Sequence, residues 1–480
     1  MACTTILVGK KASYDNSTMI ARNDDGFFDE KKLIVVNPKD QPQKYKSKIG
    51  KLEIELPSNP LRYTSTPSVN PKNGIWAANG INEANVAMTA TETITSNHRV
   101  LGADPYVIGK KKNEPWGIGE EDLVVLVLPY IKTAREGVIR LGQLLEKYGT
   151  YEPNGIAFAD ENEIWWLETI GGHHFIARRV KDDEYVIMPN QFGIDTFDLE
   201  DAFSKQEENI CSPDLKEFIS KYHLDGNNDN KFNPRLVFGS HSDQDHVYNT
   251  PRAWFMARYF NPRTYKWDGE NADFTPESDD IPWSLKPERK IGVDEVKYIL
   301  SSYYQGTPYN PYSKTAQKSG IYRSIGINRT GVMAILQIRD YVPNEIKALE
   351  WICFGPNSFN TVLPLYTNVN KFPSYVSSTT LKVDTKTFYW SSRLIAALVD
   401  PYYGDGIQLI TRYQEATLNK GMALVNKFDE EFIKSKDLKV LDKANKEICA
   451  MGEEETSKAL FNVLRLASTK MKNGYNRSDN

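Results

Sequence analysis

Short apolar runs separated by polar turns characterise the N-terminal part of the chain. The segments "TTILVG" (4–9) and "STMIARN" (17–23) are β-prone and flank a polar turn, which predicts a hairpin at the very start. The stretch "GIWAANGINEANVAMTATETI" (74–94) repeats this pattern, with two strand candidates around the turn-forming "NGINEAN". We therefore expect antiparallel hairpins here, with Cys3 at the start of a strand.

The period of the apolar positions changes after residue 120. Residues 120–147 combine acidic residues at the start with helical apolar spacing and a glycine after the end, which predicts one or two helices broken near Pro129. The next segments, "GIAFAD", "EIWWLETI", "HHFIARRV" and "YVIMPN", lie between 155 and 190 and indicate a meander of short strands.

The second half of the chain has a different character. Residues 211–320 are rich in loop formers with scattered short helices, and "IGIN", "VMAILQIR" and "ALEWICFG" (325–355) again predict strands. From about residue 386 the pattern is mainly helical. We find no internal repeat and no low-complexity linker. Helices and antiparallel strands in separate runs favour the α+β class over a doubly wound parallel sheet.

Composition and charge exclude several classes of protein. The chain is 40% hydrophobic and 25% charged, with a formal net charge of −4, as is usual for a soluble globular protein. The basic residues are scattered, so the footprint of a nucleic-acid-binding protein is missing and no nucleic-acid partner is expected. The longest apolar run, "LVVLVLPYI" (123–131), is too short to span a bilayer, so no membrane partner is expected either.

The cysteines indicate a reducing compartment. Cys3, Cys211, Cys353 and Cys449 are widely spaced and form no CxxC pair, which argues against a disulfide framework or a thiolate zinc site. The N-terminus lacks a basic segment followed by an apolar one, so a secretory signal is not supported. We expect a cytoplasmic protein.

The position of Cys3 raises a chemical possibility. A cysteine attacks as its thiolate and needs a base or a positive neighbour. If Met1 and Ala2 were removed, the α-amino group of Cys3 would supply that base, and a strand ending in "ARNDD" would bring Arg22 and Asp25 close to it. The alternative interpretation is a small apolar residue that starts an edge strand, beside an ordinary surface Arg–Asp pair. The residues alone leave both open.

The sequence resembles a known family. "CTTILVGKKASYDNSTMIARNDD" (3–25) is similar to the start of PepD-type dipeptidases, N-terminal-nucleophile cysteine hydrolases related to penicillin V acylase and bile salt hydrolase. In that superfamily an N-terminal cysteine is followed, after a hairpin, by Arg-Asn-x-Asp. The resemblance runs from residue 3 to about 370, and its further segments are 79–94, 165–180, 185–192, 248–262 and 322–339.

The resemblance implies roles for individual residues. Cys3 would be the nucleophile and, through its amine, the general base and later the general acid. Arg22 and Asp25 match the polar pair beside the thiol, and Asn190 in "MPNQF" matches the asparagine that donates to the oxyanion, worth about 3 kcal/mol of barrier. Arg252 in "TPRAWF" matches a further arginine near the site, although a buried arginine that supports the fold fits it equally.

One residue departs from the acylase relatives. Where they tend to carry a second asparagine, this chain has Glu92 in "TATETI". A carboxylate at that position could receive the free amino group that distinguishes a dipeptide from an acyl amide. We therefore include Glu92 as a candidate substrate-binding residue.

The resemblance also implies an architecture. We expect an α+β fold, the four-layer αββα N-terminal-nucleophile hydrolase sandwich with antiparallel sheets and a mainly helical C-terminal tail. Residues 3–375 would form the catalytic domain, and residues 376–480 a helical extension packed on it. Because the amine of Cys3 must be free, Met1 and Ala2 would have to be removed, for example through attack by Cys3 on the preceding carbonyl.

The predicted function is that of a cysteine dipeptidase, which hydrolyses dipeptides through a thioester on the N-terminal cysteine. The alternative is an amide acylase of the penicillin V acylase or bile salt hydrolase type. We expect no cofactor, no metal and a cytoplasmic homo-oligomer. Residues 211–320 are where we expect the walls of the pocket that reads both ends of a dipeptide.

Two further alternatives come from other classes. A binding or scaffold protein of the same fold would not need Cys3. A metallopeptidase is weakly supported: His173 and His174 are adjacent, so on a strand they would point to opposite faces, and "HSDQDH" (241–246) lacks the HExxH pattern and reads as a solvated turn.

Overall fold

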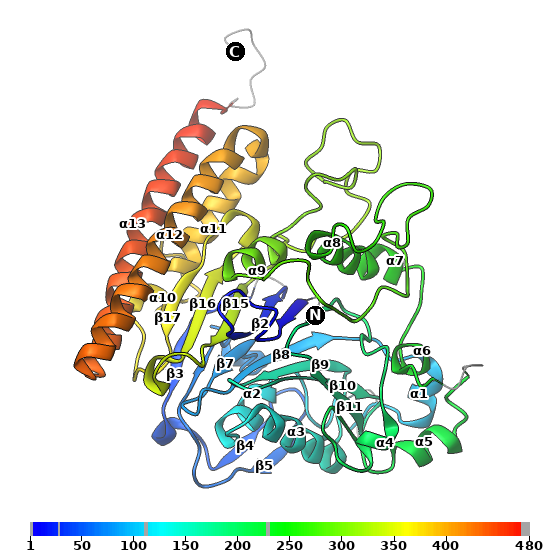
Figure 1. Cartoon of the computed structure of the whole chain (residues 1–480). Helices are drawn as coiled ribbons and strands as arrows, with labels where there is room; N and C mark the ends of the chain where they lie inside the picture. Colours follow the sequence, from blue (N-terminus) through cyan, green and yellow to red (C-terminus); the bar gives the residue numbers. More distant parts are fainter. Residues whose placement is uncertain (1–2, 27–28, 110–113, 227–230, 472–480) are drawn as a thin grey trace.

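The computed structural model describes residues 3–26, 29–109, 114–226 and 231–471, without the side chains of Asn73, Thr91 and Glu92. It contains two large antiparallel sheets and a helical C-terminal region (Figure 1). The mixed composition of helices and antiparallel strands is as predicted.

The N-terminal hairpin lies at the centre of a seven-stranded sheet, with every neighbouring pair antiparallel. Across this sheet the strands are β14 (Ser284–Leu285), β12 (Tyr185–Met188), β1 (Thr4–Val8), β2 (Thr18–Asp24), β15 (Val332–Ile338), β16 (Ala348–Phe354) and β17 (Leu363–Tyr366). The hairpin of β1 and β2 is therefore held between two strands from later in the chain, β12 and β15.

A second, six-stranded antiparallel sheet is built from the middle of the chain. Its strands, in order, are β13 (Asn209–Cys211), β11 (His174–Val180), β10 (Ile164–Ile170), β9 (Asn154–Ala159), β8 (Ala87–Thr93) and β7 (Asn79–Ile81). Two small ribbons pair β3 (Ile34–Val36) with β6 (Tyr63–Ser65) and β4 (Lys44–Lys46) with β5 (Glu53–Glu55).

The two large sheets pack against each other. Strands β2 and β15 of the first contact β8 of the second, and β2 also contacts β9. Every residue of β2, β10, β15 and β16 is buried. Burial on both faces explains why a strand such as "VMAILQI" (332–338) is almost continuously apolar rather than alternating.

Helices cover the outer face of the six-stranded sheet. α2 (Leu123–Val127) packs on β8, and α3 (Ala134–Tyr148) packs on β9, β10 and β11. One face of α3 is buried at helical spacing, including Gly137 and Gly142. A Cβ at either glycine would overlap the ring of Phe158 or Phe175, so the glycines permit the close approach of helix and sheet.

The C-terminal helices cover the other sheet. α11 (Phe388–Val399) packs on β16, whereas α12 (Tyr403–Ser435) and α13 (Lys439–Thr469) pack on β17, forming the long helical layer in Figure 1. α9 (Val293–Leu300) contacts β1, β2 and β15. The helical tail predicted from about residue 386 is confirmed.

Most of the remaining helices are short. Those between residues 211 and 320 agree with the loop-rich character predicted for that region. In chain order the remaining helices are α1 (His98–Ala103), α4 (Leu199–Ala202), α5 (Leu215–Lys221), α6 (Pro234–Phe238), α7 (Asp245–Tyr248), α8 (Thr250–Phe260) and α10 (Ser374–Ser377). Among the described helices, none is long and apolar enough to cross a membrane.

Two details of the predicted topology are wrong. β12 does not continue the meander of β9, β10 and β11 but pairs with β1, because the loop before it crosses to the N-terminal hairpin, where Gly9 and Lys11 donate to the carbonyls of Glu184 and Asp182. "IGIN" (325–328) is a turn rather than a strand, and its Ile325 carbonyl accepts a hydrogen bond from a side chain instead of a neighbouring strand.

Candidate active site

Cys3 is fully buried and directly precedes β1. Strand β1 pairs with β2 so that Thr4 lies opposite Asn23 and Thr5 opposite Arg22. Continuing this register by one step sets Cys3 opposite Asp24. Because side chains alternate between the faces of a sheet, Cys3, Arg22 and Asp24 share one face. The hairpin thus delivers a thiol, a guanidinium and a carboxylate to one place.

Arg22 is the positive neighbour of the Cys3 sulfur. Its Nη2 lies 2.8 Å from Cys3 Sγ and 2.9 Å from Glu120 Oε1, and its Nη1 donates to the Ala78 carbonyl at 3.1 Å. The side chains of Arg22 and Glu120 are only 1% and 4% exposed. A buried guanidinium in contact with sulfur favours the thiolate over the thiol.

Asp24 belongs to a second buried ion pair. Lys31 Nζ lies 3.0 Å from Asp24 Oδ2 and 2.8 Å from Asp29 Oδ2. Burial alone would raise the pKa of Asp24, but the charges of Lys31 and Arg22 outweigh it and hold that pKa below its ordinary value. Asp24 is therefore a fixed negative charge near the thiol.

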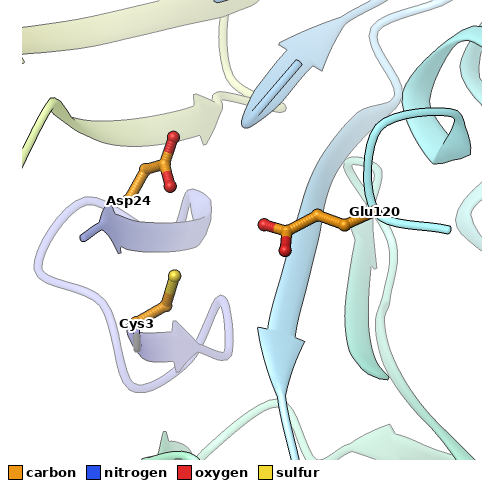
Figure 2. A group of neighbouring side chains, drawn as sticks. All are labelled: Cys3, Asp24 and Glu120. Atoms are coloured by element: carbon orange, nitrogen blue, oxygen red, sulfur yellow. The ribbon is translucent and has the colours of Figure 1, made fainter. Parts of the chain in front are cut away.

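Glu120 reaches the thiol from a separate segment. It precedes α2, and Figure 2 shows its carboxylate pointing toward Cys3 and Asp24 across the gap between the segments. Its backbone N–H donates to Glu152 Oε1 at 2.8 Å. Burial, and then the charge of Glu120, raise the pKa of the Glu152 carboxyl to about 7. Among the described residues, Glu120 Oε2 has no hydrogen-bond partner.

Cys3, Asp24 and Glu120 also have the spacing of metal ligands. One ligand atom from each lies within 4.8 Å of the others, which makes them the one such cluster in the described part of the chain. The Nη2 of Arg22 already lies 2.8 Å, 3.6 Å and 2.9 Å from the three, respectively. A metal ion would have to displace this cation, so the donor set fits a guanidinium better.

Asp25 is buried with partners other than Arg22. Thr330 Oγ1 donates to Asp25 Oδ1 at 2.6 Å, and Arg323 Nη2 donates to Asp25 Oδ2. Asp25 is 0% and Arg22 2% exposed. The alternative of an ordinary surface Arg–Asp pair is therefore wrong on both counts: the residues are buried, and each has its own ion-pair partner.

Arg252 joins Cys3 to Asn190. From α8, its Nη1 donates to the Cys3 carbonyl and, at 2.7 Å, to Thr4 Oγ1, and its Nη2 donates to Asn190 Oδ1 at 2.7 Å. The same Nη2 donates to Asn249 Oδ1, and Nε donates to the Tyr248 carbonyl, both at 2.8 Å. All five N–H groups of the guanidinium thus have acceptors.

Asn190 is oriented from both ends of its amide. Its Oδ1 accepts from Arg252, and its Nδ2 donates to the Thr93 carbonyl at 2.9 Å. The loop that follows is held by Glu168, whose Oε1 accepts from the N–H groups of Gly193 and Ile194 at 2.6 Å and 3.3 Å. Burial raises the pKa of Glu168 to about 7.

A cavity of about 520 Å³ reaches Asn190. The other residues that line it are Thr93, Thr95, Ser240, Ser242, Gln244, Asp245, Tyr248 and Asn249. Most of them come from the segment 240–249, within the region 211–320 where we expect pocket walls. A substrate in this cavity would contact Asn190 and Asn249, whose side chains both accept hydrogen bonds from Arg252.

The histidine clusters have structural partners. His173 lies in a turn and β11 begins only at His174, so both rings face Asp104, with Nδ1 to carboxylate distances of 3.0 Å and 2.8 Å. The expectation that they point to opposite faces is wrong. In "HSDQDH" (241–246) residues 241–244 form an exposed turn, as predicted, whereas Asp245 begins α7, is buried and accepts from Asn249, a partner of Arg252, at 2.6 Å.

Some predicted features lie outside the described residues. These are Met1 and Ala2, whose removal the resemblance implies, and the side chain of Glu92. The backbone of Glu92 lies in β8 and pairs with Gly155.

The sequence did not single out Glu120 or Arg323 as site residues. Glu120 was part of an acidic run that reads as the start of a helix, and its proximity to Cys3 depends on the packing of distant segments. Arg323 lies in "YRSIGINRTG" (322–331), one of the segments that carry the resemblance, and this was the available signal.

Comparisons with known proteins agree on one family. The model of peptidase family C69 matches residues 2–416. The chain is 50% identical over 532 residues to "Dipeptidase" of Bifidobacterium longum and 50% identical over 485 residues to "Probable dipeptidase A" of Streptococcus pyogenes serotype M3, with all of both chains covered in each case. It is 44% identical to "Probable dipeptidase B" of Lactococcus lactis, covering all of this chain and 98% of the relative.

Proposed function

Because the chain belongs to peptidase family C69, we propose that it hydrolyses dipeptides with Cys3 as the nucleophile. Membership makes it a peptide-bond hydrolase, and the names of its relatives support dipeptides as substrates. The single observation that carries the assignment of Cys3 is its contact with Arg22, 2.8 Å between Nη2 and Sγ in a buried site. This contact holds the sulfur ready as a thiolate.

The proposed reaction has two halves. The Cys3 thiol passes its proton to the α-amino group of Cys3, and the sulfur attacks the carbonyl carbon of the peptide bond and forms a C–S bond. The C–N bond then breaks as the departing nitrogen takes that proton from the amino group, which leaves a thioester and a free amino acid. A water molecule loses a proton to the same amino group and attacks the thioester carbon, so that the C–S bond breaks, the second amino acid is released and the sulfur takes the proton back.

Asn190 is assigned to the oxyanion of both tetrahedral intermediates. Arg252 and the Thr93 carbonyl fix the orientation of its amide. A donor that is already oriented does not need to reorganise when negative charge develops on the substrate oxygen, and such a donor is worth about 3 kcal/mol of barrier. Arg252 acts through Cys3 and Asn190 and is therefore a positioning residue.

The proton carrier in this proposal is the α-amino group of Cys3. An α-amino group titrates near pH 8, so part of it is neutral at pH 7 and can accept a proton. This role requires removal of Met1 and Ala2. Asp25, held by Arg323 and Thr330, completes the polar surroundings of the hairpin end.

The architecture supports the same assignment. Two facing antiparallel sheets with helices on their outer faces fit the four-layer αββα sandwich of N-terminal-nucleophile hydrolases, with the hairpin of Cys3 at the centre of one sheet. Within this scheme residues 3–375 form the catalytic domain and residues 376–480 its extension, since α11 and α13 pack on β16 and β17. A cytoplasmic location and a homo-oligomeric state stay predictions.

A substrate panel tests the proposal against the acylase alternative. Purified protein is assayed with dipeptides, tripeptides, penicillin V and a conjugated bile salt, with the Cys3→Ala variant as control. We expect hydrolysis of dipeptides by the unmodified sequence and at least a 1000-fold lower rate in the variant, because the nucleophile is lost. Cleavage of the acyl amides alone, or full activity of the variant, would contradict it.

A further inference from the structure

Two buried carboxylates, those of Asp24 and Glu120, lie close to the Cys3 sulfur. Asp24 pairs with both Arg22 and Lys31, whereas Glu120 shares Arg22 with Asp24 and the sulfur. Fixed carboxylates repel a thiolate. Glu120 therefore does not stabilise the nucleophile, and its position beside the sulfur points to a different partner.

The Glu120 carboxylate can accept a hydrogen bond from one more donor. Its Oε1 accepts from Arg22, while its Oε2 is buried and has no hydrogen-bond partner in the part of the chain that the structure describes. The residue is only 4% exposed. Leaving a buried carboxylate oxygen unpaired is costly, and a cationic ligand with N–H groups would satisfy it.

Glu120 lies at a distance from the nucleophile that suits binding of the α-ammonium group of a dipeptide. The α-amino nitrogen of the first residue lies about 2.5 Å from the carbonyl carbon under attack, given ordinary bond lengths. That carbon approaches the sulfur to about 3–3.5 Å before reaction. A hydrogen bond to the ammonium group adds about 3 Å, so a carboxylate that binds it must lie within about 9 Å of the sulfur. A Glu120 oxygen lies within 4.8 Å of Cys3 Sγ.

We propose that Glu120 binds the free α-ammonium group of the substrate and thereby restricts hydrolysis to peptides with an unblocked N-terminus. This inference rests on the proposed function and names the residue that selects the substrate. An acyl amide has no ammonium group, so it would leave Glu120 Oε2 unpaired and pay for burying it. Glu152, whose side chain accepts from the backbone N–H of Glu120, holds the backbone of that residue in place.

The test compares two substrates that differ only in the amino group, alanyl-alanine and propanoyl-alanine. We expect the unmodified sequence to prefer alanyl-alanine in kcat/KM by 100-fold or more. In Glu120→Gln, kcat/KM for alanyl-alanine should fall about 10- to 100-fold more than kcat/KM for propanoyl-alanine, as expected for loss of a charge-assisted hydrogen bond to the ammonium group. The preference should therefore collapse.

A matched control is Glu121→Gln. Glu121 is equally buried, but its carboxylate is satisfied by Ser47, Gly50 and Tyr151, so this variant should keep the substrate preference. Glu92→Gln separates the two candidate carboxylates, because collapse of the preference in that variant alone would assign the ammonium to Glu92 and overturn the proposal.

Three other results overturn the inference. An equal loss for both substrates in Glu120→Gln would mean that Glu120 serves Arg22 or the amine of Cys3 rather than the substrate. Equal hydrolysis of both substrates by the unmodified sequence would refute it without any variant, even if the variants fail to fold. If the unmodified sequence cleaves propanoyl-alanine but no dipeptide, the proposed function itself fails.

Discussion

Arg22 Nη2 lies 2.8 Å from Cys3 Sγ at the centre of a buried sheet. The same nitrogen lies 2.9 Å from Glu120 Oε1, so one guanidinium holds both the sulfur and a carboxylate from another segment. Arg22 is central in β2, with Thr5 opposite on one side and Ala334 on the other. Its position is therefore set by two neighbouring strands.

Replacement of Arg22 tests whether this contact activates the sulfur. Arg22→Gln should slow alkylation of Cys3 by iodoacetamide at least 10-fold and lower kcat for dipeptides by 100-fold or more, because the thiolate loses its counter-charge. Arg22→Lys should recover part of both. Peptide mass spectrometry locates the adduct, and the other cysteines serve as an internal control, since burial raises the pKa of Cys211, Cys353 and Cys449 to about 12. Unchanged alkylation in Arg22→Gln would refute the role.

Asn190→Ala removes the proposed oxyanion donor. We expect kcat for dipeptides to fall 100- to 1000-fold with KM changed by less than about threefold, since the oxyanion exists only in the transition state and the intermediates. The neighbouring variant Gln191→Ala is the control, because that side chain donates to the Ser240 carbonyl instead. Equal kinetics of the two variants would remove Asn190 from the mechanism.

Arg252→Lys tests the positioning network. A lysine cannot supply five N–H groups in a planar fork, so the Cys3 carbonyl and the Asn190 side chain lose their common anchor. We predict at least a 100-fold lower kcat and a lower unfolding temperature. Arg258→Lys on the same helix is the control, since Arg258 is partly exposed and pairs with Asp268. Rates that are normal in Arg252→Lys would mean that the arginine only supports the fold.

Glu168 should make stability depend on pH. Burial raises its pKa to about 7, whereas an ordinary glutamate in the unfolded chain titrates near 4.5. Between these values the folded state binds more protons, so the free energy of unfolding falls as pH rises, by about 1 kcal/mol from pH 6 to pH 8. In Glu168→Gln, which keeps an acceptor for Gly193 and Ile194, the unfolding temperature should fall less over this interval. A parallel fall in both proteins would contradict the shift.

Local sequence patterns predicted most of the elements but not their partners. The hairpin of β1 and β2, the helix break near Pro129 and the helical tail all depend on turn formers and periodicity within one segment. The placement of β12 beside β1 instead of β11 depends on packing between segments about 180 residues apart, which no local pattern records.

In the site, too, contacts within one segment could be predicted and contacts between distant segments could not. Arg22 could be predicted beside Cys3 because the two lie on one hairpin with a fixed register. Glu120 could not, because its contact with Arg22 joins residues 98 positions apart. The pairing of Asp25 with Arg323 likewise spans 298 positions, so no local pattern predicts it.

The central claim is that Cys3 acts with its own α-amino group, and one measurement on one sample tests it most directly. Intact-mass spectrometry with N-terminal sequencing is combined with a dipeptide assay of the same purified protein. We predict a mass that lacks Met1 and Ala2, a first residue Cys3, and hydrolysis of dipeptides. A chain that still begins with Ala2 and nevertheless cleaves dipeptides would contradict the claim, because its Cys3 nitrogen would be an amide without basic character.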